Sequence, residues 1–290
     1  MKDTLRRFLF EHLPVRGETA HLDATWQAVL ERHDYPPALR GVLGELMAAA
    51  ALLAATLKFE GSIILQLHGS GPVTLIVVEC TSEQTLRATA KWSGPLDAGA
   101  PLSSLLGEGR FVITLSPTGG TQNYQGVVDL QGGGVAACLE HYMSRSEQLQ
   151  TRLWLAADDT RAAGMLLQQL PGRAEDDPDG WNRIGRLGDT LTGEELLGLP
   201  PEQILHRLYH EDDIRLFEPR PVSFRCSCST QRVVTMLRML GRDEVRSIVE
   251  ERNTVDVTCE FCNKRYTFDA VDAEQVFAAE GVAAAGRTRH

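Results

Sequence analysis

The feature that most constrains this chain of 290 residues is a cluster of cysteines near its C-terminal end. Cys226 and Cys228 form one tight pair, C-S-C, and Cys259 and Cys262 form a second, C-E-F-C. Two short turns that each supply two thiolates satisfy the tetrahedral coordination that zinc prefers. No histidine lies between the two pairs to compete as a ligand. The pattern therefore predicts one zinc ion held by these four cysteines.

The region around these cysteines is too small to bury a large core. Its pattern predicts a helix from Ser229 or Thr230 through Leu240, a helix over Asp243–Arg252, a strand over Thr254–Thr258, a return strand at Tyr266 and Phe268, and a short helix opening at Asp272. We expect the small, polar tail Gly281–His290 to be frayed. Because so small a region gains little from apolar burial, bound metal is expected to supply folding free energy.

The first part of the chain, residues 1–172, mixes strand and helix patterns. Apolar or alternating stretches predict strands at Gly61–His68, Val73–Cys80, Arg110–Ser116, Asn123–Leu130 and Thr151–Ala157. Helical patterns cover Asp23–His33, Pro37–Leu57 and Gly133–Ser144, and the second is apolar on nearly every face, as in a buried helix. Strands and helices do not alternate regularly, so we predict an α+β domain. The remaining cysteines, Cys80 and Cys138, are interpreted as small buried apolar residues.

The middle of the chain is strongly acidic. Residues 173–220 contain 6 basic and 12 acidic residues, whereas the whole chain has a net charge of −10. After the breaker run Arg173–Gly180, Thr192 and Glu195 form a capping box, and Pro201 suits the first turn of another helix. Such short helices are unstable alone, so their leucine faces must dock on another surface. From the residues alone, an acidic helical regulatory linker over 173–224 and an ordinary interdomain linker remain about equally good interpretations.

Several functional classes are disfavoured. The longest apolar run, Leu46–Leu57, has 12 residues and is too short to span a bilayer, and the N-terminal residues lack the apolar stretch of a secretory signal. We therefore expect a cytoplasmic protein without a membrane partner. The acidic net charge, and a nearly neutral zinc region without a basic stripe, argue against nucleic-acid binding. A zinc-ribbon adaptor for nucleic acid remains a weaker alternative.

An enzymatic function is also disfavoured. None of the four lysines follows a glycine, so the chain has no Walker A loop for ATP. The main enzymatic alternative is a thiol oxidoreductase that uses Cys259 and Cys262, because C-x-x-C is a redox motif. That motif normally opens a helix, whereas here it is predicted to lie between two strands. We therefore predict a protein without catalytic residues.

Taken together, these motifs resemble a known family. C-S-C-S at 226–229 and C-E-F-C at 259–262, followed by Tyr266 and Phe268, resemble the redox-regulated, zinc-switched bacterial heat-shock holdases of about thirty-three kilodaltons. The resemblance extends over nearly the whole chain, through the stretches 69–79, 142–148, 162–171 and 204–217. One departure is Met143, where the family pattern has an aromatic residue.

The resemblance implies an ATP-independent chaperone that is inactive while reduced and zinc-bound. Oxidative stress would release the zinc and form the disulfides Cys226–Cys228 and Cys259–Cys262, and the oxidised protein would form a homodimer. Its partners would be unfolded or misfolded client proteins. The implied organisation is an α+β client-binding domain over 1–172, the regulatory linker over 173–224, and a zinc-binding redox-switch domain over 225–290.

Overall fold

The structure, a computed structural model, describes residues 3–58, 60–119, 122–130, 133–172, 177 and 179–285. By its internal contacts the chain divides into two compact units, Met1–Arg225 and Cys226–His290.

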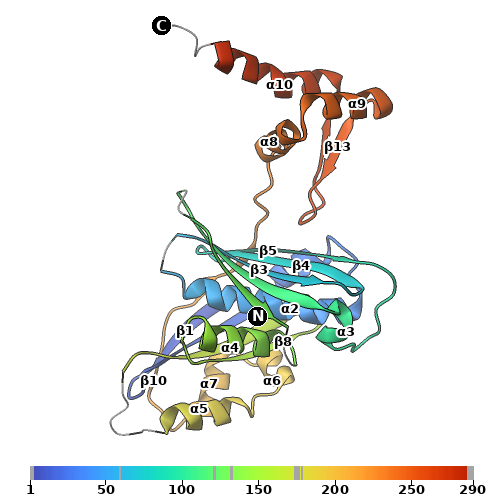
Figure 1. The fold of residues 1–290 in the computed structure, drawn as a ribbon. Coiled ribbons are helices and arrows are strands. Elements are labelled where there is room, and N and C mark those ends of the chain that lie inside the picture. The colour runs from blue at the N-terminus through green and yellow to red at the C-terminus, as the bar shows by residue number, and fades with distance from the viewer. Residues whose placement is uncertain are drawn as a thin grey trace. The chain divides into compact units, whose positions relative to one another are not determined.

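The first unit contains two six-stranded sheets (Figure 1). Sheet A has the order β10-β1-β2-β9-β8, with β11 also pairing with β1, and all of its pairings are antiparallel. Its strands are β1 Thr4–Phe10, β2 Val15–Leu22, β8 Thr151–Ala157, β9 Ala162–Gln169, β10 Ile214–Leu216 and β11 Arg220–Pro221. Sheet B has the order β12-β5-β4-β3-β6-β7, and only the short β12 pairs in parallel. Its strands are β3 Gly61–Gly69, β4 Val73–Thr81, β5 Thr85–Trp92, β6 Gly109–Pro117, β7 Tyr124–Asp129 and β12 Ser223–Phe224.

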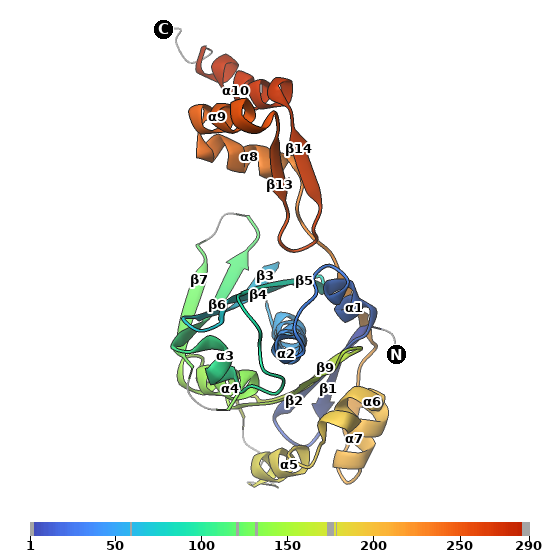
Figure 2. The ribbon, with the colours of Figure 1, turned by 90° about the vertical axis from the view of Figure 1, so that its right-hand side faces the viewer.

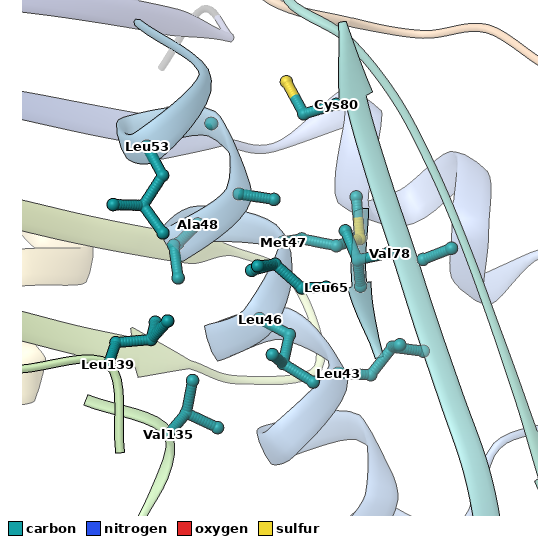
Figure 3. Close-up of a cluster of buried hydrophobic side chains, with 14 of the residues drawn as sticks. Leu43, Leu46, Met47, Ala48, Leu53, Leu65, Val78, Cys80, Val135 and Leu139 are labelled. Carbon is teal, nitrogen blue, oxygen red and sulfur yellow. The ribbon is translucent and has the colours of Figure 1, made fainter. Parts of the chain in front are cut away.

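Helix α2, Pro37–Ala55, lies between the two sheets, and Figure 2 shows it end-on. Its apolar residues face both sheets, which is why the sequence is apolar nearly all round. In Figure 3, Leu46 and Met47 of α2 lie beside Leu65 and Val78 of sheet B. Among the described residues, α2 alone has the length and composition of a membrane span, but 72% of that apolar window is buried inside the protein. It is the central core helix of this unit.

Three further helices complete the same core. They are α1 Ala24–Leu30, α3 Leu102–Leu106 and α4 Val135–Arg145. In α4, Val135 and Leu139 point toward α2 (Figure 3). The other face of α4 is polar, and Glu140 accepts a hydrogen bond from the backbone N–H of Leu153 in β8 at 2.7 Å.

The outer face of sheet A, opposite α2, is covered by three short helices (Figure 2). These are α5 Gly180–Gly188, α6 Gly193–Gly198 and α7 Pro201–Tyr209. The predicted capping box of Thr192 and Glu195 opens α6, and Pro201 occupies the first turn of α7. A second apolar core forms between these helices and the sheet. Sheet A is therefore apolar on both faces.

The second unit is built around a small core. It contains α8 Thr230–Leu240, α9 Arg242–Arg252, the antiparallel hairpin β13 Val255–Thr258 and β14 Arg265–Phe268, and α10 Ala270–Ala285. The buried members of its core, among the described residues, are Val233, Leu237, Val245, Val255, Tyr266, Phe268, Ala273, Val276 and Phe277.

The structure confirms the predicted α+β class and every predicted helix and strand, with ends that shift by a few residues. Among the described residues, seven strands were missed, namely β1, β2, β5, β9, β10, β11 and β12, and so were the helices α3 and α5. The tail prediction is wrong over 281–285, where α10 continues through an alanine-rich stretch, because alanine is the best helix former. Residues 286–290, and most of the run Arg173–Gly180, lie outside the described residues. The division into 1–172, 173–224 and 225–290 stays a prediction.

Candidate metal centre

The two cysteine pairs occupy two different kinds of local structure. Cys226 and Cys228 lie on the extended segment before α8, whose first turn is capped by Ser229, which accepts a hydrogen bond from the Arg232 backbone N–H. Cys259 and Cys262 lie in the turn between β13 and β14. This C-x-x-C therefore connects two strands, as predicted, and does not open a helix as in the oxidoreductase alternative.

The second turn is tight and internally hydrogen-bonded. Asn263 has φ of 57°, a left-handed conformation that asparagine tolerates better than most residues. The Cys259 backbone N–H donates to the Lys264 carbonyl at 3.0 Å, and the Asn263 N–H donates to the Cys259 carbonyl at 2.9 Å. These bonds fold the chain back so that both cysteines point to the same side of the hairpin end.

The four thiols converge on one point. All four sulfur atoms lie within 4.8 Å of one another. Cys226 Sγ is 3.6 Å from Cys259 Sγ, and Cys228 Sγ is 3.4 Å from Cys262 Sγ. A tetrahedron with zinc–sulfur distances of about 2.3 Å has edges of about 3.8 Å. The sulfur arrangement therefore fits a tetrahedral metal ion and is compatible with zinc.

One tyrosine supports this arrangement. The hydroxyl of Tyr266 donates a hydrogen bond to Cys228 Sγ at 3.1 Å, and the Lys264 ammonium lies 5.1 Å from the centre of the tyrosine ring. The hydrogen bond to Cys228 raises the pKa of Tyr266 to about 12, so the hydroxyl keeps its proton and remains a donor. The sequence placed Tyr266 on the return strand but did not assign it this role. Its position four residues after the second pair is the only signal that points to it.

The thiols have unequal acidities. Partial burial opposes ionisation of Cys228, but the hydrogen bonds from Tyr266 and the other thiols outweigh it and lower its pKa to about 7. Burial, together with the neighbouring thiols, raises the pKa of Cys262 to about 12. Burial likewise raises the pKa of Cys226. Four sulfurs this close cannot all ionise without a compensating positive charge, which a bound divalent metal would supply.

The other two cysteines are not part of this cluster. Cys80 and Cys138 are buried in the core of the first unit, at 0% and 1% exposure, as the sequence predicted. Burial raises the pKa of the Cys80 thiol well above its usual range, so the thiol stays protonated. Within the described part of the chain, the four C-terminal cysteines are the single group of three or more histidine, cysteine or acidic side chains placed to hold a metal.

Comparison with known proteins agrees with this fold and site. The family model described as Hsp33 protein matches residues 3–269. The 33 kDa chaperonin of Methylobacillus flagellatus is 53% identical over 100% of this chain and 99% of its own length. That of Chromobacterium violaceum is 54% identical over 99% of this chain and 98% of its own. The crystal structure of the 33 kDa chaperonin from Thermotoga maritima shares the fold, with a TM-score of 0.83 at 21% identity, covering 97% of this chain and 99% of that one.

An α+β unit followed by four cysteines placed to hold a metal, in a chain with chaperonin relatives, defines a chaperone rather than an enzyme. The chain belongs to the Hsp33 protein family. The family resemblance, the fold class and the absence of a catalytic function that the sequence predicted are thereby confirmed. As a chaperone of this family, the protein binds unfolded client proteins.

Proposed function

We propose that this protein is a redox-regulated, ATP-independent holdase, inactive while reduced and zinc-bound. In this proposal Cys226, Cys228, Cys259 and Cys262 hold one zinc ion. Bound zinc would stabilise the fold of the small second unit by bringing its two halves together. The convergence of the four sulfur atoms supports this assignment, as does the small core of the second unit.

Oxidation removes the ligands that the metal needs. In the proposed reaction two thiols of one pair lose two electrons and two protons to form a disulfide, and peroxide accepts them to form two molecules of water. The pairs are Cys226–Cys228 and Cys259–Cys262. Zinc fingers gain about 10–16 kcal/mol from metal binding, which exceeds the stability of most small domains. Loss of zinc would therefore unfold the second unit.

The main observation that supports the proposal is that three short helices cover the apolar outer face of sheet A. Phe8 and Phe10 of β1 are buried there, at 0% and 5% exposure, together with Met165 and Leu167 of β9. They are covered by apolar residues of α5, α6, α7 and the connection between α5 and α6, namely Ile184, Leu191, Leu196, Ile204, Leu205, Leu208 and Tyr209. Releasing these helices would expose a large continuous apolar surface, and such surfaces bind unfolded chains.

The covering helices are suited to release. None exceeds nine residues, and helices this short depend on tertiary contacts. Ion pairs such as Arg6–Glu202 and Arg152–Asp189 attach the acidic segment to arginines of sheet A. Once those contacts break, the net charge of the segment favours its extension. Residues 173–224 would then act as the regulatory linker, 1–172 as the client-binding domain and 225–290 as the switch domain.

The proposed oligomeric state, cellular location and conditions of activity rest on the resemblance to the family. The oxidised protein would form a homodimer and hold unfolded clients in the cytoplasm during oxidative stress. The regulatory linker is favoured over a plain linker because its helices bury a large part of the outer face of sheet A.

One experiment tests the coupling directly. Reduced, zinc-loaded protein is treated with peroxide at mildly elevated temperature, and released zinc and suppression of client light scattering are followed in one sample. Zinc release and suppression should rise together. A Cys80→Ala variant is the matched control, because it lacks a cysteine outside the centre and should release zinc as the parent does. Zinc release without any gain in suppression would contradict the proposal.

A further inference from the structure

One histidine lies inside the contact between sheet A and the acidic segment. His21 is on β2, on the same outer face as Val15, and is 2% exposed. Its Nε2 lies 3.0 Å from the backbone carbonyl oxygen of Leu196 in α6. Because a carbonyl only accepts, Nε2 must carry the proton and donate. This hydrogen bond connects sheet A to α6 across a sequence separation of 175 residues.

The second ring nitrogen is left without a partner. Nδ1 of His21 is buried and has no hydrogen-bond partner among the described residues. In the neutral imidazole this atom is an unprotonated acceptor, and leaving it unpaired has a modest cost. In the imidazolium it becomes a charged donor without an acceptor in a dry site, which is far more costly. The geometry therefore favours the neutral ring while α6 is docked.

We propose that His21 is a pH-sensitive latch that holds α6 on sheet A while its imidazole is neutral, so that mild acid loosens the acidic segment without any change at the cysteines. The consequence for client binding rests on the proposed function above, because it requires that release of the segment exposes the chaperone surface.

The charged groups around His21 do not remove this preference. Asp23, at the end of the same strand, favours the charged ring. Arg6 of β1 and Glu202 of α7 are paired with each other. Arg161, before β9, donates to the Leu197 carbonyl of α6 at 3.3 Å, and Glu195 of α6 is bound by the side chain of Arg207. None of these side chains hydrogen-bonds to Nδ1 of the imidazole.

The balance of these effects lowers the pKa of His21. Burial is the largest cause and lowers it, whereas the Leu196 and Leu199 carbonyls and the charge of Asp23 act in the opposite direction. The released state, with a solvated ring, therefore binds the proton more readily than the docked state. Docking is unaffected above about pH 6.5, the ordinary pKa of histidine, and weakens as the pH falls below it.

Other buried groups of the same unit titrate with the opposite sign. Burial raises the pKa of Glu18, on the inner face of β2, to about 7, and that of Glu45 in α2 to about 7. Their folded forms take up protons as the pH falls, which stabilises the unit as a whole. The latch must therefore be detected locally, in α6, and as a difference between the parent and a variant that lacks the imidazole.

The test uses the full-length, reduced, zinc-loaded protein and the variant His21→Gln, whose side-chain amide still donates to the Leu196 carbonyl but does not titrate. Hydrogen exchange of α6 amides is measured by mass spectrometry and corrected for the pH dependence of intrinsic exchange. In the parent, α6 protection should fall by up to about tenfold between about pH 7.5 and about pH 5.5. In H21Q, the protection of α6 should change by less than about twofold over the same pH range, which is on the order of the scatter between measurements. His12→Gln, which removes an exposed histidine that contacts Asp213, should behave as the parent does.

A second measurement covers the case in which H21Q fails to dock α6. NMR of histidine side-chain nitrogens in the parent should show His21 as the Nε2–H tautomer with a pKa below about 6.5. Equal loss of α6 protection in the parent and H21Q, or a His21 pKa at or above that value, would overturn the latch. Peroxide activation of the parent near neutral pH separates the two proposals, because it does not depend on protonation of the imidazole. Failure to gain client protection there would contradict the proposed function and would leave the latch, which is detected in α6 protection, unaffected.

Discussion

The two units of the chain are stabilised by different means. In Met1–Arg225, α2 is enclosed by two six-stranded sheets, and its core draws residues from nearly every element of that unit. Among the described residues of Cys226–His290, the buried core comprises nine side chains, and four sulfur atoms gather at the end of the hairpin. A core of that size contributes little, so in the proposed function metal ligation would supply most of the stability of this unit. Under this proposal, an oxidant that attacks thiolates would unfold one unit and leave the other intact.

The largest expected effect comes from removing all four ligands. Replacing Cys226, Cys228, Cys259 and Cys262 with serine should abolish zinc binding and forfeit about 10–16 kcal/mol of binding free energy. The second unit should lose its dispersed amide signals in NMR spectra, whereas signals from α2 should persist. Chelation of zinc from the reduced parent should have the same effect.

The control for this prediction is Cys80→Ala, which removes a buried thiol from the core of the first unit. It should lower the unfolding temperature of that unit and leave zinc content unchanged. Retention of a folded second unit in the four-serine variant would refute the contrast between the two cores.

The two faces of sheet A also differ in how firmly they are covered. The inner face is covered by one helix of 19 residues, and the outer face by three helices of nine residues or fewer. Ile204→Ala in α7 and Leu46→Ala in α2 each delete a fully buried side chain and should each cost about 2–5 kcal/mol. We expect I204A to release the acidic segment, because the deletion weakens the core between α7 and the outer face of sheet A. The core around α2 stays intact, so I204A should protect clients without oxidant.

Leu46→Ala is the matched variant for the inner face. It should lower the global free energy of unfolding in denaturant without exposing the outer face, so its reduced form should stay inactive toward clients. If both variants gained equal activity without oxidant, activity would reflect general destabilisation, and the outer face would have no special role.

Local sequence signals predicted the parts of the molecule that depend on local chemistry. The spacing of the cysteines was sufficient to predict that Cys226 and Cys259 would meet. The capping box at Thr192 marked the start of α6, and the uniformly apolar stretch in Pro37–Leu57 identified the buried helix. Each of these signals depends on residues close together in the chain.

The elements that were missed depend on distant partners. In β1, Arg6 and Arg7 interrupt the apolar alternation, yet Arg6 pairs with Glu202 and Arg7 with Glu18. Polar residues of β2 such as His21 are buried because sheet A is covered on both faces, which no local pattern reveals. The outer face of sheet A and the latch proposed for His21 were therefore beyond what the sequence alone could predict.

A smaller effect is expected where α5 crosses the sheet. A methyl group at Gly188 would overlap the indole ring of Trp154, whereas at Gly185, in the same helix, nothing lies within 4 Å. Gly188→Ala should force α5 away from the sheet at a cost of about 1–3 kcal/mol. Gly185→Ala should instead stabilise α5 by up to about 1 kcal/mol, because alanine favours the helix. Hydrogen exchange of α5 amides in the two variants measures both effects, and loss of protection in both would indicate that α5 is sensitive to any substitution.

The smallest effect we predict concerns the cap of α6, the helix that His21 contacts. The Thr192 hydroxyl accepts a hydrogen bond from the Glu195 backbone N–H at 3.2 Å, and the Glu195 carboxylate accepts one from the Thr192 N–H at 3.0 Å. Thr192→Ala should cost α6 about 0.5–2 kcal/mol, and Thr192→Ser, which keeps the hydroxyl, should cost much less. Because α6 is one of three helices that dock on the outer face, T192A should lower the peroxide concentration needed for activation without activating the reduced protein. Full activity of reduced T192A would mean that α6 alone holds the segment in place, and an unchanged peroxide threshold would mean that α5 and α7 are sufficient without it.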